Sequence, residues 1–143
     1  MVAMNSPDDS LALTHRVLVV EDNEHTAHLL EFMLQRAGYD VLTALNGRDA
    51  QEILDNEEPV DIILLDLMLP YVSGIELITI ARDNPEWRYV PILVVSGKVL
   101  EQDIVKALDL GANDYVTKPF RPQELLARVR RLVATREAQE RHH

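Results

Sequence analysis

Five short apolar runs alternate with helical patterns along this chain, and no other feature of the sequence restricts its fold as much. The runs lie at residues 16–20, 39–44, 60–65, 92–95 and 115–117. The helical patterns lie at residues 24–37, 47–56 and 101–110, between Ser73 and Pro85, and from about residue 122 onward. Strands that alternate with helices form a parallel sheet, because each helix carries the chain back across it. The sequence therefore predicts an α/β fold, a doubly wound five-stranded parallel sheet with five helices.

Residues at the ends of these segments support the predicted boundaries. Asn46 and Ser73 can each accept a hydrogen bond from the first turn of the helix that follows. Gly38 and Gly111 end helical patterns, as glycine commonly does. The last pattern repeats apolar residues at helical spacing: Leu125, Leu126, Val129, Leu132 and Val133. That spacing predicts a final helix with one face packed against the sheet.

The length and composition of the chain suit one globular domain, with 143 residues of which 47% are hydrophobic. We predict a flexible leader at residues 1–14, a domain at residues 15–135 and a polar tail or connector at residues 136–143. The chain has no cysteine for a disulfide or a thiolate metal site, and its start lacks the pattern of a secretory signal. No apolar stretch approaches the roughly 20 residues of a membrane span. We therefore expect a cytoplasmic location and no membrane contact.

Polar and charged residues follow the predicted strands, at the point where each strand ends. They are Glu21 and Asp22 after the first strand, Asp66 after the third, Ser96 after the fourth and Lys118 after the fifth. Each of them alone could be a helix cap, a turn hydroxyl or a solvated charge. However, the carboxyl ends of parallel strands meet at one edge of the sheet, where ligands bind. The four strand ends together therefore predict a functional site.

The residue types at this edge indicate phosphoryl chemistry. Three carboxylates in one cleft repel one another and raise the pKa of at least one of them. A Mg²⁺ ion would remove that cost, because it binds oxygen ligands and keeps waters that phosphate oxygens can replace. Lys118 adds a positive charge suited to a phosphate or a carboxylate. A carboxylate can act as a nucleophile and form an acyl phosphate, and we expect Asp66 to do so.

The strand-end residues, together with the segment LLDLMLPYVSG at residues 64–74, resemble the receiver domain of two-component response regulators. The resemblance covers about residues 15–135, and several separated motifs match in order and spacing. It implies a flavodoxin-like fold of the receiver type. It also implies that Asp66 is the phosphoacceptor, and that Mg²⁺ is held by Glu21, Asp22, Asp66 and the backbone carbonyl of Met68.

The resemblance further implies a conformational switch beside the acceptor. Ser96 matches the hydroxyl that turns toward the phosphoryl group, and Tyr115 matches the aromatic ring that moves inward when Ser96 moves. Lys118 would contact the phosphoryl group, and the Lys118–Pro119 peptide bond is cis in the family. The surface of the fourth helix, fifth strand and fifth helix would then change and control a partner or an output domain.

The partners implied by the resemblance are a histidine kinase or a histidine phosphotransfer protein as the phosphoryl donor. The net charge of −10 argues against direct nucleic-acid binding by this chain. Some surface charges resemble those through which receivers attached to winged-helix transcription factors dimerise. The candidate pairs across such a dimer are Lys106–Glu124, Asp114–Arg128 and Asp109–Arg130. No enzymatic role is expected beyond the chain's own phosphorylation and dephosphorylation.

Three other functions are alternatives to this one. A haloacid-dehalogenase-like phosphatase carries a second aspartate two residues after its nucleophile, where this chain has Met68. A nucleotide-binding domain would need a glycine-rich phosphate loop, and the sequence has neither GxGxxG nor GxxxxGK[ST]. A receiver-like interaction domain that is never phosphorylated remains the third alternative, although the full acidic set disfavours it.

Overall fold

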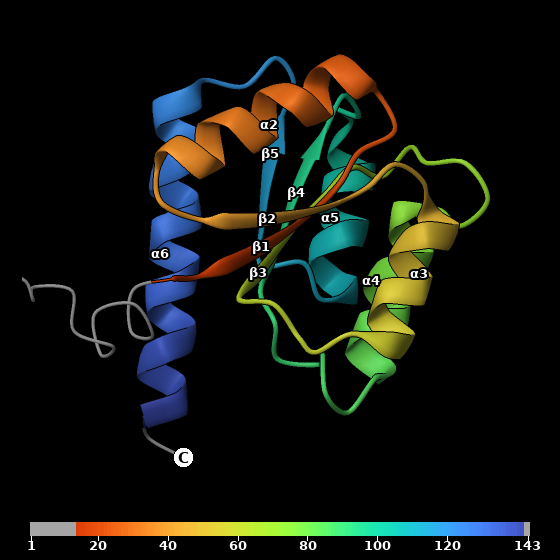
Figure 1. Ribbon diagram of the computed structural model, residues 1–143. Helices are drawn as coiled ribbons and strands as arrows, with labels where there is room; N and C mark the ends of the chain where they lie inside the picture. The colour runs from red at the N-terminus through yellow and green to blue at the C-terminus, as the bar shows by residue number, and fades with distance from the viewer. Residues whose placement is uncertain (1–13, 142–143) are drawn as a thin grey trace, which may run out of the picture.

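The computed structural model describes residues 14–141 as one parallel sheet between two layers of helices (Figure 1). The strands are β1 (Arg16–Val20), β2 (Asp40–Ala44), β3 (Ile62–Leu65), β4 (Ile92–Ser96) and β5 (Asp114–Thr117). The helices are α2 (Glu24–Arg36), α3 (Gly47–Asn56), α4 (Gly74–Asp83), α5 (Glu101–Leu110) and α6 (Pro122–Arg141). All strand pairs are parallel, in the order β2-β1-β3-β4-β5. The predicted doubly wound fold is confirmed.

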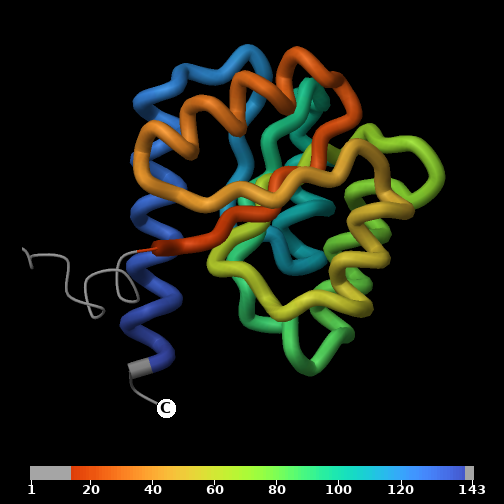
Figure 2. Tube along the Cα trace, in the orientation of Figure 1, coloured from red at the N-terminus to blue at the C-terminus, as the bar shows by residue number. Residues whose placement is uncertain are grey.

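The core has two halves, one on each face of the sheet. Helices α2 and α6 cover one face, and α3, α4 and α5 cover the other, as Figures 1 and 2 show. Successive residues of a strand point to opposite faces, so each central strand contributes to both halves. Leu18 and Ile63 belong to the half beneath α3 and α4, whereas Val19 and Leu64 belong to the half beneath α2 and α6. This arrangement explains why the central strands have no polar alternation.

The register of the central strands places the predicted site. Val20 at the end of β1 lies beside Leu65 at the end of β3. The next residue on each strand, Glu21 and Asp66, therefore emerges at the same edge. The amide of Asp66 donates to the Val20 carbonyl at 3.0 Å, which extends the pairing by one residue.

Most predicted boundaries agree with the structure within two residues, and one detail concerns the site. Ser96 is the last residue of β4 instead of the first residue beyond it. Phe32 is 58% exposed, because the buried face of α2 is formed by Ala27, Leu30, Met33 and Leu34. The segment predicted as a polar tail or connector, residues 136–143, is helical as far as residue 141, where it continues α6. Residues 1–13 of the predicted leader and residues 142–143 lie outside the described part of the chain.

The end of α6 contacts the amino edge of the sheet. The guanidinium of Arg136 donates to the carbonyl of Val60, just before β3, and Glu137 pairs with His15 at 3.0 Å. These contacts lie at the opposite end of β3 from Asp66. Within residues 14–141, none of the helices combines the length and the apolar character that crossing a membrane requires.

A capping box starts α4, the helix that follows the loop after Asp66. The Ser73 hydroxyl accepts from the amide of Glu76 at 3.2 Å, and the Glu76 carboxylate accepts from the amide of Ser73 at 3.4 Å. Loss of such a cap leaves helix amides without a partner and typically costs about 1 kcal/mol. We therefore expect Ser73→Ala to lower the free energy of unfolding in urea by about 1 kcal/mol. Thr79→Ala, on the exposed face of the same helix, should have little effect, and equal stability of both variants would contradict this role of Ser73.

Candidate functional site

The carboxyl edge of the sheet brings the predicted acidic residues together. Glu21 and Asp22 follow β1, and Asp66 follows β3. One carboxylate oxygen from each of the three lies within 4.8 Å of the others. Glu21 and Asp66 are only 2% and 4% exposed, whereas Asp22 faces solvent. The site thus joins two buried carboxylates with one that is exposed to solvent.

Lys118 joins the two buried carboxylates. Its Nζ lies 2.6 Å from Oε1 of Glu21 and 2.8 Å from Oδ2 of Asp66. Lys118 follows β5 at the edge of the sheet, whereas Glu21 and Asp66 come from its centre, so the long side chain reaches across the end of β4. The Lys118–Pro119 peptide bond is cis, as the resemblance predicted. Lys118 is therefore the positive charge of the site.

The electrostatics of the site reflect burial of like charges. Burial raises the pKa of Glu21, and the nearby Asp66 carboxylate adds to the shift, although hydrogen bonds from Lys118 and the Asn23 amide oppose it. Burial also disfavours the charged form of Lys118. Its hydrogen bonds to Asp66 and Glu21 outweigh that cost, so the pKa of Lys118 is raised. One ammonium therefore compensates three neighbouring carboxylates only in part.

The donor set of this cluster fits a hard divalent cation. All three side chains of the cluster, Glu21, Asp22 and Asp66, offer carboxylate oxygens, which Mg²⁺ prefers to nitrogen or sulfur. Oxygens that share a Mg²⁺ ion at about 2.1 Å lie roughly 3 to 4 Å apart in an octahedron. The oxygens of the cluster are within 4.8 Å of one another, so a small contraction would bring them into that range. A cation at this position would also relieve the repulsion between the carboxylates.

The orientation of the Asp66 carboxylate is fixed on both sides. Oδ1 accepts from the amide of Met68 at 3.1 Å, and Oδ2 accepts from Lys118. The resemblance implied a role for the Met68 carbonyl, whereas the contact of the Met68 amide with Asp66 is seen only in the structure. The amide contact ties the loop after β3 directly to Asp66.

The two predicted switch residues, Ser96 and Tyr115, both form hydrogen bonds with the backbone of Lys98, in the loop after β4. Ser96 is completely buried, and its Oγ accepts from the amide of Lys98 at 3.3 Å. The Tyr115 hydroxyl donates to the carbonyl of Lys98 at 2.7 Å, and burial raises the pKa of Tyr115. Tyr115 therefore lies beside the site and not among its carboxylates. The role of Lys98 in linking these residues comes from its backbone, which the sequence did not indicate.

The surface charges predicted to pair across a dimer are partly paired within the chain. Asp114 accepts from Arg128 at 2.8 Å and from Arg131 at 3.0 Å, and Arg128 also lies 3.2 Å from Glu124. The Asp114–Arg128 contact is therefore an intrachain ion pair in this structure.

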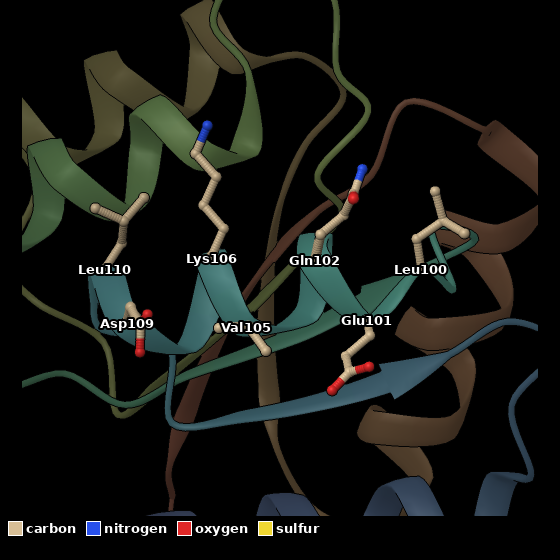
Figure 3. A pocket seen from close by; sticks show the side chains of 7 residues that line it. All are labelled: Leu100, Glu101, Gln102, Val105, Lys106, Asp109 and Leu110. Atoms are coloured by element: carbon tan, nitrogen blue, oxygen red, sulfur yellow. The ribbon is translucent and has the colours of Figure 1, made fainter.

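A shallow groove runs along α5, and its lining includes Lys106 and Asp109 (Figure 3). In the view of Figure 3 the Lys106 side chain points upward from the helix and that of Asp109 points downward, and both are exposed to solvent. The apolar residues Val105 and Leu110, which are 47% and 37% exposed, lie beside them. This face of α5 therefore presents both apolar and charged side chains to solvent.

Comparison with known proteins identifies relatives of this chain. The family model for the response regulator receiver domain matches residues 17–130. A putative response regulator from Chloroflexus aurantiacus is 36% identical, covers 85% of this chain and 98% of its own, and superposes with a TM-score of 0.78. The receiver domain of the sensor histidine kinase PA1611 from Pseudomonas aeruginosa is 31% identical, with the same coverages and TM-score, and its structure has a magnesium ion in the active-site cleft. The receiver domain of the Francisella response regulator 1452 is 30% identical, again with coverages of 85% and 98% and a TM-score of 0.78.

Proposed function

Because the chain belongs to the response regulator receiver domain family, we propose that Asp66 is its phosphoacceptor in two-component signalling. The observation that carries this proposal is the cluster of Asp66, Glu21 and Asp22 with Lys118 bound to the two buried carboxylates. Such a cluster offers an oriented carboxylate, a set of oxygen ligands for a divalent cation and a positive charge beside both buried carboxylates. Phosphoryl transfer needs mainly positioning and charge neutralisation, which these groups supply.

The proposed reaction forms an acyl phosphate on Asp66. A carboxylate oxygen of Asp66 attacks the phosphorus of the donor, the new O–P bond forms, and the bond between phosphorus and the donor atom breaks with its electron pair. Lys118 would pair with an oxygen of the transferred group, and the Met68 amide would hold the second carboxylate oxygen in place. A magnesium ion held by Glu21, Asp22, Asp66 and the Met68 carbonyl would neutralise negative charge on the phosphoryl oxygens.

The signal would pass from Asp66 to the loop after β4. A phosphoryl group offers strong acceptors to the Ser96 hydroxyl, whose oxygen accepts from the amide of Lys98. Movement of Ser96 toward the phosphate would displace Lys98 and break its contact with the Tyr115 hydroxyl. The Tyr115 ring could then turn inward, and the surface of α5, β5 and α6 would change. This is a two-state element biased by a local charge, as such switches require.

The proposed physiological setting follows from the family. The donor is a histidine kinase or a histidine phosphotransfer protein in the cytoplasm, and the receiver unit is residues 15–135. The chain's only chemistry on phosphate is then its own phosphorylation and dephosphorylation. The charges on α5 and α6 support an output in transcription regulation through a winged-helix DNA-binding domain.

Intact mass spectrometry tests the proposed function directly. Incubation with acetyl phosphate and Mg²⁺ should add the mass of one phosphoryl group to the chain, and excess EDTA should prevent the addition. A chain that gains no phosphate under either condition would be a receiver-like interaction domain. Catalytic release of phosphate from phosphate esters would instead support a haloacid-dehalogenase-like phosphatase.

Magnesium should stabilise the folded chain through the acidic cluster. A ligand that binds only the native state stabilises it by about 2.7 kcal/mol at one hundred times its Kd, which corresponds to several degrees in the unfolding temperature. We expect Mg²⁺ to raise the unfolding temperature of the wild type by that amount and Asp22→Asn to lose most of the shift. In EDTA, Asp22→Asn should be no less stable than the wild type, because it removes a repelling charge.

The control for this measurement is Asp83→Asn, an exposed carboxylate at the end of α4. This variant should keep the full magnesium shift. A shift that survives in Asp22→Asn would place the cation elsewhere.

We also propose a phosphorylation-dependent homodimer through α5, β5 and α6. The predicted pair Asp109–Arg130 should then bridge two chains, since the structure uses neither residue in an intrachain ion pair within residues 14–141. Beryllofluoride with Mg²⁺, a phosphoryl mimic, should raise the sedimentation coefficient. Asp109→Arg should weaken that response, and adding Arg130→Asp should restore it. An unchanged coefficient in the wild type would contradict the dimer.

A further inference from the structure

The loop between Asp66 and α4 contains a strained turn at an exposed residue. The amide of Val72 donates to the carbonyl of Pro70 at 2.9 Å, and Tyr71 between them has φ of 73°. A hydrogen bond across three residues with positive φ at the central one is a γ-turn of the rare, strained kind. Among the described residues, Tyr71 is the only one other than glycine with positive φ. Such strain persists only where neighbouring groups hold the backbone in place.

Gly47 and Arg48, the first two residues of α3, contact this turn and restrict its backbone. The amide of Gly47 donates to the same Pro70 carbonyl at 3.1 Å. A Cβ on residue 47 would overlap the carbonyl oxygen of Val72, so only glycine allows the helix and the loop to approach this closely. The guanidinium of Arg48 lies 3.9 Å from the centroid of the Tyr71 ring. The turn is thus fixed by one hydrogen bond, one backbone contact and one cation–π contact.

The Arg48–Tyr71 contact is closer than the comparable contacts in the described part of the chain. Arg36 lies 5.5 Å from the Phe32 ring, and Arg88 lies 6.0 Å from the Tyr89 ring. Tyr71 is 70% exposed, so it contributes little to the hydrophobic core. Its contact with Arg48 therefore fixes the loop without stabilising the core.

The other end of the loop forms part of the site. The amide of Met68 donates to Oδ1 of Asp66, and the amide of Gly74 donates to the carbonyl of Leu67 at 3.0 Å. Between these anchors, the position of the Met68 backbone depends on the path that the chain takes through residues 70–72. A change in the γ-turn would therefore alter both the Met68 carbonyl and the orientation of the Asp66 carboxylate.

We propose that Arg48 and Tyr71 are positioning residues for the metal site. They clamp the γ-turn and thereby hold the Met68 carbonyl and the Asp66 carboxylate in the arrangement that binds Mg²⁺. This inference rests on the proposed function, in which both groups are metal ligands. It extends the site beyond the strand ends to the amino end of α3. Arg48 would act on the site through the Tyr71 ring and the loop, and not through the three carboxylates.

Titration calorimetry with Mg²⁺ tests this role in the full chain. Arg48→Ala and Tyr71→Gly should each weaken Mg²⁺ binding about twofold to fivefold, the range expected for loss of one solvent-exposed cation–π contact. Tyr71→Phe keeps the ring and should bind Mg²⁺ as the wild type does. Arg36→Ala removes a cation from the Phe32 ring on α2 and is the matched control, with unchanged affinity expected.

Urea unfolding in EDTA separates positioning from general stability. Glycine adopts positive φ without strain, so Tyr71→Gly should be at least as stable as the wild type while it binds Mg²⁺ more weakly. Hydrogen exchange of the Val72 amide, measured without metal, should become faster in Arg48→Ala. A parallel loss of stability and affinity in Tyr71→Gly would mean that the residue is merely structural.

The remaining outcomes overturn the inference in distinguishable ways. If the wild type binds Mg²⁺ and both Arg48→Ala and Tyr71→Gly bind it equally well, the positioning role is wrong and the proposed function stands. If the wild type does not bind Mg²⁺, the metal site of the proposed function is wrong and the positioning role falls with it.

Discussion

Replacing Asp66 with asparagine is expected to abolish phosphorylation of the chain by acetyl phosphate. The amide of asparagine is a very poor nucleophile, so no acyl phosphate can form at residue 66. The substitution preserves the size of a side chain that is only 4% exposed, and it removes one of three repelling carboxylates. The variant should therefore fold normally and show no added phosphoryl mass under conditions that phosphorylate the wild type completely.

Asp40→Asn provides the matched control for this prediction. Asp40 is an exposed aspartate at the start of β2, at the amino edge of the sheet. The Asp40→Asn variant should be phosphorylated at the wild-type rate, since residue 40 lies at the edge of the sheet opposite the cluster of Glu21, Asp22 and Asp66. Phosphorylation of Asp66→Asn would assign the acceptor to another carboxylate, and Asp22 would be the first to examine.

Gly74→Ala is expected to produce the second large effect, on both stability and the site. A Cβ at residue 74 would lie 2.5 Å from the Cα of Leu67 and would overlap the carbonyl oxygen of Asp66. Both neighbours are backbone atoms next to the acceptor, so they cannot move without displacing Asp66. Overpacking of this kind costs about 3 kcal/mol. We expect that loss in urea unfolding, together with a marked loss of phosphorylation.

Gly97→Ala is the natural comparison, because it places the same methyl group in a roomy part of the site. The nearest atom to a Cβ at residue 97 would be Cε of Met68 at 3.7 Å, an ordinary contact with a flexible side chain. Its effect on the free energy of unfolding should stay within about 1 kcal/mol, and it could be stabilising through the unfolded chain. If Gly74→Ala were as stable as Gly97→Ala, the close approach of α4 to the Asp66 backbone would not be a constraint.

The sequence predicted the fold and the location of the site because both depend on local patterns. Apolar runs such as residues 62–65 become central strands, since only strands buried on both faces lack polar alternation. The parallel order then brings the residues that follow β1, β3 and β5 to one edge. Glu21, Asp66 and Lys118 meet there in the structure, with Lys118 bound to both carboxylates.

The contacts that shape the loops could not be predicted in the same way. The γ-turn at Tyr71 depends on Gly47 and Arg48, which lie more than twenty residues earlier in the chain and belong to another helix. The link between Ser96 and Tyr115 passes through the backbone of Lys98, and backbone groups are the same for nearly every residue type. Residue type alone also does not tell that Phe32, an apolar residue of α2, is exposed, because that depends on its position off the buried face of the helix.

The most direct measurement is the chemical position of the phosphoryl group. Borohydride reduces an acyl phosphate of aspartate to homoserine, which tandem mass spectrometry locates in the peptides of the digested chain. After incubation with acetyl phosphate and Mg²⁺, we expect homoserine at position 66 and at no other aspartate, and none when EDTA is present. Homoserine at position 22, or an unmodified position 66 in a chain that has gained phosphate, would contradict the assignment of Asp66 as the acceptor.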